Sequence, residues 1–142
     1  MKLSPADPVV LKTLRREHHA RCFIGRPETS FGLGVEYRVT DDGGVEATVE
    51  CPDSWEGYAG LVHGGIIAAL LDGAMTNALF ARGIVALTAD MDIRFRESLE
   101  LGRTARVSAD VEPFWPRVYK ATARIEQEGR ECASCTGTFM VR

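Results

Sequence analysis

The stretch Leu61-Val-His-Gly-Gly-Ile-Ile-Ala-Ala-Leu-Leu-Asp-Gly-Ala-Met-Thr-Asn-Ala-Leu-Phe80 is the longest apolar run in the chain. It opens with a turn at His63-Gly64-Gly65, and the residues that follow are apolar on nearly every side, which predicts a helix buried all round. One carboxylate, Asp72, lies near the middle of the run. A buried ionisable group is costly unless it is paired, neutralised or left facing a cavity. Asp72 therefore requires a specific environment.

The rest of the chain predicts elements that could enclose this helix. Alternation of apolar and polar residues predicts strands and a hairpin, and the dipole-matched charges near the N-terminus predict a short helix. The expected elements are a helix at 5–16, strands at 33–39 and 45–51, the turn and central helix at 61–82, and strands at 86–96, 104–112, 118–126 and 131–141. Short connections favour antiparallel neighbours. The order predicts an α+β fold in which one antiparallel sheet of about six strands wraps a single long central helix.

Length and composition restrict the class of protein. The chain has 142 residues, 45% of them hydrophobic, which predicts a single domain over 1–142. Within it we expect an N-terminal helix and lead-in at 1–24 and four antiparallel strands at 86–141. The net charge of −3 argues against nucleic acid or an anionic membrane as the main partner. The adjacent His18 and His19 are interpreted as a solvated helix end without a role.

Localisation is expected to be cytoplasmic. No signal-peptide pattern opens the chain, and the stretch 65–81 is interpreted as too short and too polar, with Asp72 and Asn77, to span a membrane. The four cysteines fit reduced thiols better than a disulfide framework. A metal site at Cys132 and Cys135 is not expected, because residues three apart on a strand point to opposite faces.

The motif His63-Gly64-Gly65 followed by Asp72 resembles the signature of the hotdog-fold thioesterases, specifically the PaaI-like branch that hydrolyses acyl-coenzyme A (acyl-CoA) thioesters. The similarity covers roughly residues 30 to 141. It includes the lead-in Gly57-Tyr-Ala-Gly-Leu-Val62, the stretch Thr88 to Phe95, Leu101-Gly102 and the closing Gly137-Thr-Phe139. The resemblance implies the hotdog fold, a curved antiparallel sheet around a central helix, and thioesterase activity without a cofactor or a metal.

The resemblance also implies a site shared between two chains. His63 and Asp72 are separated by about 13 Å along a helix axis, which is too far for both to act on one carbonyl carbon. The family arrangement places the active site at the interface of a homodimer, where the turn of one subunit meets the acid of the other. Stacking of two dimers into a homotetramer is left open.

Each motif residue acquires an expected role from the family. The Gly64 backbone N–H would stabilise the oxyanion, and Gly65 beside it and Gly57 in the lead-in would help to bind the substrate. Asp72 would activate water as a general base or attack as a nucleophile. His63 would shape the turn, and Thr88 would orient the water. The alternative from the residues alone is that Gly64 and Gly65 only permit a tight turn and that Asp72 hydrogen-bonds backbone or Thr76.

One position departs from the family pattern. Several relatives carry Asn or Gln six or seven residues before the histidine, where this chain has Gly57 and Glu56. Either Glu56 takes a supporting polar role in substrate binding or the role is missing. Contacts to CoA phosphates are predicted at Arg96 and Arg117. The departure keeps open a second function, a non-catalytic acyl-CoA or small-acid binding protein on the same scaffold. A third possibility is a hotdog hydratase or dehydratase, but the pattern of an acid and a histidine that such enzymes carry is not seen in this sequence.

Overall fold

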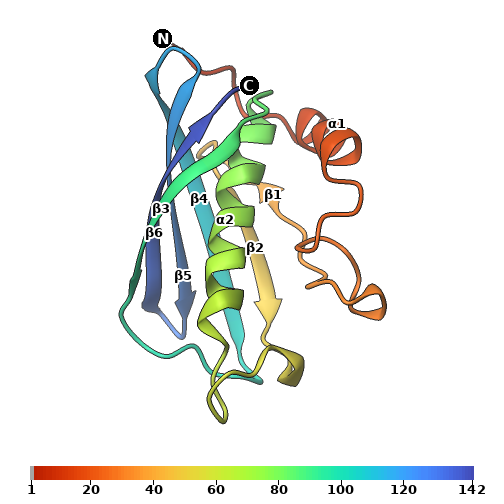
Figure 1. Cartoon of the computed structure of the whole chain (residues 1–142), viewed down its shortest axis with the longest axis vertical. Helices are drawn as coiled ribbons and strands as arrows, with labels where there is room; N and C mark the ends of the chain where they lie inside the picture. The colour runs from red at the N-terminus through yellow and green to blue at the C-terminus, as the bar shows by residue number, and fades with distance from the viewer. Residues whose placement is uncertain (1) are drawn as a thin grey trace.

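The computed structural model describes residues 2–142 and has a sheet curved around one long helix (Figure 1). The helices are α1 (Pro8–His18) and α2 (Gly64–Ala81), with short 3₁₀ turns η1 (Glu28–Ser30) and η2 (Asp53–Trp55). The strands are β1 (Arg38–Val39), β2 (Val45–Glu50), β3 (Leu87–Phe95), β4 (Thr104–Trp115), β5 (Val118–Gln127) and β6 (Arg130–Met140). All pairings are antiparallel, in the order β1-β2-β4-β5-β6-β3. The predicted α+β fold is confirmed.

The central helix is buried because the sheet and the N-terminal segment cover it. The sheet packs along one side, and α1 with the segment after it lies beside the C-terminal half of α2 (Figure 1). Leu70, Leu71, Ala74, Met75 and Leu79 are fully buried. One stripe near the start of α2 stays uncovered: Gly64 and Gly65 are exposed, and Ala68, Ala69 and Asp72 are partly exposed. The predicted site residues Gly64, Gly65 and Asp72 lie on this stripe.

By length and composition, α2 is long enough and apolar enough to cross a membrane, with a mean hydropathy of 1.4 over 18 residues. The expectation that this stretch is too short was therefore wrong on length, because the helix begins at Gly64. Yet 67% of it is buried inside the protein. A core helix meets the same criteria, and the burial supports that interpretation.

Several element ends differ from the sequence prediction. Strand β1 has only two residues, because Leu33 and Val35 pair with Phe23 and Ile24 of the lead-in and not with β2. Strand β4 runs on to Trp115, with a change of register between Pro113 and Trp115. A proline has no N–H to give to a ladder, and an irregularity of this kind accommodates it. Helix α1 begins at Pro8, one residue after its cap Asp7, whose carboxylate accepts from the N–H of Val9.

A glycine marks the end of α2. Gly83 has a φ of +77° and its N–H donates to the carbonyl of Phe80. A positive φ is accessible to glycine at little cost, so this residue ends the helix in a left-handed cap. The chain then turns into β3, which lies at the edge of the sheet beside β6. The helix and the edge strand are thus held side by side.

Candidate functional site

The turn before α2 presents backbone donors at the start of the helix. His63 caps α2, and its Nδ1 accepts a hydrogen bond of 2.8 Å from the N–H of Gly65. The His63 N–H donates to the carbonyl of Trp55. No hydrogen bond within residues 2–142 uses the N–H of Gly64, which is exposed at the positive end of the helix dipole. This N–H is available to an oxygen that develops negative charge.

Two glycines keep the turn close to His63. A Cβ on Gly57 would lie 2.9 Å from the Cα of His63, and a Cβ on Gly65 would lie 3.0 Å from its Nδ1. A Cβ on Gly64, in contrast, would make only ordinary contact with the ring of Phe95, at 3.7 Å. A side chain at Gly57 would thus collide with the backbone of His63, whereas one at Gly65 would require only a small shift of the His63 ring. Gly64 is not required for steric reasons.

Glu56 is used inside its own turn. Its carboxylate accepts a hydrogen bond of 2.8 Å from the N–H of Gly60, and its backbone bridges to Val62. In this chain the side chain holds the loop from 57 to 60 in place. A role for Glu56 or Gly57 in binding a substrate stays a prediction.

Asp72 is paired with Thr88. The Thr88 hydroxyl donates to Asp72 Oδ1 at 2.7 Å, from strand β3 to the middle of α2. The alternative partner named from the sequence, Thr76, makes no hydrogen bond with the carboxylate among residues 2–142. One oxygen of the carboxylate is thus oriented by a hydroxyl, and the second carries no hydrogen bond from residues 2–142. That second oxygen can accept a proton.

Gly64 and Asp72 do not meet within one chain. Eight residues of helix separate them, which is about 12 Å along the axis. Both lie on the uncovered stripe of α2. A single chain therefore offers an exposed backbone donor and a carboxylate paired with Thr88 at two separate positions on α2.

A narrow crevice begins beside Asp72, between α2 and the N-terminal segment. Its volume is about 40 Å³. The polar side chains in its wall are Arg15, His19, Cys22, Asp72, Thr76 and Asn77. The sequence interpretation of His19 as solvated was wrong: its ring packs edge-on against Phe80 at 4.9 Å, and burial lowers its pKa despite the nearby charge of Asp72.

The two arginines predicted to bind phosphate lie at opposite ends of the sheet. Arg96 follows β3 and forms an ion pair of 3.1 Å with Glu131. Arg117 lies in the turn between β4 and β5, with a φ of +65°, and donates to the carbonyl of Val141. The nine residues of β3 between these ends span roughly 30 Å. One chain does not bring the two arginines to a common ligand.

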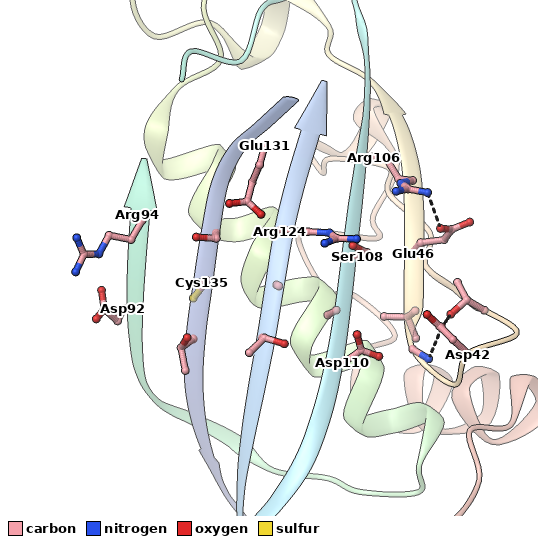
Figure 2. A pocket seen from close by; sticks show the side chains of 18 of the residues that line it. Asp42, Glu46, Asp92, Arg94, Arg106, Ser108, Asp110, Arg124, Glu131 and Cys135 are labelled. Atoms are coloured by element: carbon pink, nitrogen blue, oxygen red, sulfur yellow. Dashed lines mark hydrogen bonds and ion pairs between the residues drawn. The ribbon is translucent and has the colours of Figure 1, made fainter. Parts of the chain in front are cut away.

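A wide hollow lies on the face of the sheet away from α2 (Figure 2). It has a volume of about 510 Å³ and is lined by charged side chains, among them Arg106, Arg124 and Glu46. These are joined by exposed ion pairs such as Arg106 with Glu126 at 3.3 Å, which contribute little to stability. Its lining includes neither Asp72 nor Gly64. Within residues 2–142, no group of three or more His, Cys, Asp or Glu side chains is arranged to hold a metal ion.

Comparison with protein families gives one match. The model of the thioesterase superfamily matches residues 59–134, which include the turn, α2 and most of the sheet. A comparison with curated proteins gave no match.

Solved structures of the same architecture are numerous. A thioesterase superfamily protein shares 26% identity at a TM-score of 0.78, over 83% of this chain and 62% of its own. A putative thioesterase related to phenylacetic acid degradation, from Ralstonia eutropha JMP134, shares 25% identity at a TM-score of 0.70. The match covers 88% of this chain and 98% of the relative. A Streptococcus mutans UA159 protein solved bound to acetyl CoA shares 24% identity at a TM-score of 0.70. The match covers 76% of this chain and 88% of that protein. The chain thus spans less than two thirds of the first of these and most of the other two.

Proposed function

The chain belongs to the thioesterase superfamily and has its hotdog fold, and we propose that it hydrolyses acyl-CoA thioesters with water activated by Asp72. The observation that carries the proposal is the pairing of Asp72 with Thr88 on the uncovered stripe of α2, eight residues from an N–H that has no partner within residues 2–142. The relative solved with acetyl CoA supports a CoA ester as the ligand.

The proposed site is completed by a second copy of the chain. Strand β3 pairs with β6 on one side only among the described residues, and most of its residues are exposed. An edge strand with a free ladder readily pairs with another chain. Two β3 strands joined antiparallel about a two-fold axis would bring the uncovered stripes of two α2 helices together, with small Ala68 and Ala69 at their contact. We infer a homodimer with two equivalent sites. Two such dimers can stack into a tetramer.

In this arrangement the reaction needs only water and the ester. The free oxygen of Asp72 takes a proton from a water molecule, whose oxygen attacks the thioester carbonyl carbon. The oxyanion accepts a hydrogen bond from the N–H of Gly64 of the partner subunit, aided by the helix dipole. The carbon–sulfur bond then breaks, and the thiolate leaves and takes up the proton. Thr88 holds the carboxylate, and His63 holds the turn that aims the donor.

The test is hydrolysis of short, medium, long and aryl acyl-CoA esters, followed by release of free thiol. Replacing Asp72 with Asn keeps the size of the side chain and its hydrogen bond with Thr88 but removes the base. We expect turnover to fall by about 10²-fold or more, the usual contribution of a general base. Unchanged turnover on a good substrate would rule out Asp72 as the base.

A non-catalytic binding protein is the second candidate. It is favoured by the lead-in turn, where Glu56 is occupied by Gly60 and no Asn or Gln is present to position a water molecule. A binding protein would show saturable thermal protection by acyl-CoA and release no thiol from any ester of the panel. The same preparation thus distinguishes the two functions.

A cytoplasmic location is part of the proposal. Cys22, Cys51, Cys132 and Cys135 are all free thiols in the structure, which suits a reducing compartment.

A further inference from the structure

The edge strand β3 carries charges that its own sheet does not neutralise. On the face of β3 that points away from α2, two acidic residues are followed by two basic ones. These exposed residues are Asp90, Asp92, Arg94 and Arg96, the last directly after the end of the strand. The residues opposite the first three on β6 are uncharged: Thr138, Thr136 and Ser134. Pairing within the sheet therefore gives these charges no opposite charge across the ladder.

Most of these charges also lack a partner elsewhere in the chain. Asp90, Asp92 and Arg94 form no ion pair within residues 2–142, whereas Arg96 pairs with Glu131 at 3.1 Å. In Figure 2 the side chains of Asp92 and Arg94 extend from β3 on the side away from β6. That side is the free edge of the sheet. A strand with the complementary order of charges would fit this edge.

The opposite face of the same stretch is apolar. Met91 and Ile93 are partly buried and pack against the core. Phe95 is 58% exposed, and its ring lies 3.7 Å from the position that a Cβ on Gly64 would take. Opposite residues in an antiparallel pair have side chains on the same face. A second β3 strand therefore matches this face only if the two-fold axis passes through a residue, because a shift of one residue reverses the faces.

The charges distinguish the registers that remain. An axis at Asp92 would place the two copies of this acid opposite each other, and an axis at Arg94 would do the same for the two arginines. Axes at Met91 or at Phe95 would also oppose like charges, two acids in the first case and two bases in the second. Like charges directly opposite each other are destabilising.

An axis at Ile93 opposes unlike charges at every position. It places Asp92 opposite Arg94 of the partner subunit and Asp90 opposite Arg96 of the partner subunit, each twice by symmetry. We propose that two copies of this chain pair through β3 in this register, and that the order of the four charges selects it. The inference rests on the proposed function, which takes β3 as the edge where two chains meet.

This register also aligns the two halves of the proposed site. It places Phe95, which lies beside Gly64, opposite Met91 of the partner subunit. Three residues before Met91 in each chain is Thr88, which holds Asp72. The start of one α2 is thereby brought toward the middle of the other.

Cross-linking tests the register. Opposite residues have Cα atoms about 4.5–5.5 Å apart, within the range of a disulfide, whereas diagonal neighbours lie at roughly 7–8 Å, beyond that range. Chains with Asp92→Cys and chains with Arg94→Cys are co-expressed with two different tags, oxidised and analysed on non-reducing gels. We expect cross-links between the two variants and none within either variant alone. Wild-type protein, in which three of the four cysteines are buried, measures the background.

Other cross-linking patterns would overturn the proposal. Self-cross-linking of Asp92→Cys would place the axis at residue 92, and that of Arg94→Cys would place it at residue 94. Cross-links in no combination would show that the strands pair in another register or not at all.

Charge reversal tests what selects the register. Asp92→Arg and Arg94→Asp each turn two opposite-charge pairs into like-charge pairs, so the dimer Kd should rise about tenfold to a hundredfold at low ionic strength and less in high salt. Mixed together, the two variants should form a heterodimer with opposite charges at both positions. Asp110→Arg is the matched control, because Asp110 is an exposed acid on the same face, opposite Thr122, but lies inside the sheet. Analytical ultracentrifugation measures each Kd. Equal effects of Asp92→Arg and Asp110→Arg, or no recovery in the mixture, would refute the role of the charges.

Both tests measure assembly and need no substrate. The expected cross-links together with undiminished turnover by Asp72→Asn would refute only the proposed function. Hydrolysis that depends on Asp72, together with cross-links in another register, would refute only this inference.

Discussion

In the proposed mechanism Gly64 acts through its backbone N–H. This contribution can be tested separately from the space that its missing side chain leaves. The residue is the first of α2, and the capping residue before it, His63, has φ −59° and ψ +134°. That extended conformation is the one favoured before a proline, and the first helical position tolerates proline because its N–H has no partner within the helix. The N–H of Gly64 can therefore be removed with the helix kept intact.

We predict that Gly64→Pro lowers kcat about 10²- to 10³-fold, the usual effect of losing one oxyanion donor. Gly64→Ala is the matched control, because it keeps the N–H and its Cβ makes only ordinary contact with Phe95. Steady-state kinetics of both variants, with circular dichroism to check the fold, measures the difference. Equal losses in the two variants would show that space, and not the N–H, is what Gly64 provides.

At the residue scale, the sequence pattern identified candidate residues but not their surroundings. The family resemblance implied that Thr88 orients the attacking water; that role stays a prediction, and the structure shows the Thr88 hydroxyl donating to Asp72. His19 was dismissed because its neighbourhood depends on how α1 packs against Phe80, which no local pattern encodes.

At the element scale, the turn before α2 depends on the absence of side chains. Gly57 donates its N–H to the carbonyl of Leu61 and lies against the backbone of His63. Trp55, 4% exposed, anchors the same turn through its carbonyl, which accepts from the N–H of His63. The position of the donor at Gly64 thus depends on the packing of two segments, 55–57 and 61–63.

Gly57→Ala should destabilise the protein by about 1–3 kcal/mol, the usual cost of overpacking, because the new Cβ would meet the Cα of His63 at 2.9 Å. Turnover should also fall, since the turn that holds Gly64 must shift. Urea unfolding measures the first effect and kcat/KM the second. Gly64→Ala adds the same methyl group seven residues further along the chain and is expected to destabilise the protein much less. If Gly57→Ala is as stable as the wild-type protein, the turn can move to accommodate the new Cβ, which would contradict this prediction.

Element types followed from the sequence, but element ends did not. The apolar run predicted α2, because the signal of an apolar helix is local. The brief β1 and the extension of β4 past Pro113 depend on which segments become neighbours. Leu33 and Val35 alternate as a strand would, yet they pair with the lead-in, a choice made by tertiary packing.

At the scale of the whole molecule, the buried thiols give stability a dependence on alkaline pH. Burial raises the pKa of Cys51 and of Cys135 to about 11, from an ordinary value of 9.0. The unfolded chain therefore loses these protons first, so stability falls as the pH rises from about 9 to about 11.

We predict a shallower decline for a Cys51→Ala, Cys135→Ala double variant. Removing both thiols removes their contribution to the slope, whatever the variant costs at neutral pH. Urea unfolding of both proteins at several pH values between 8 and 11 gives the two slopes. Parallel curves would show that these thiols ionise equally in the folded and unfolded states.

The proposed division of the site between two chains can be tested only on the whole assembly. If each site takes Asp72 from one subunit and Gly64 from the other, a mixed dimer of Asp72→Asn and Gly64→Pro chains contains one intact site and one doubly defective site. Random pairing of equal amounts makes half of the dimers mixed, so about one quarter of wild-type activity should return. Both parents are expected to be nearly inactive alone. Co-expression with two different tags isolates the mixed dimer, which should show half the wild-type activity per dimer. A mixed dimer no more active than its parents would place both groups in the same chain, where about 12 Å of helix separates them.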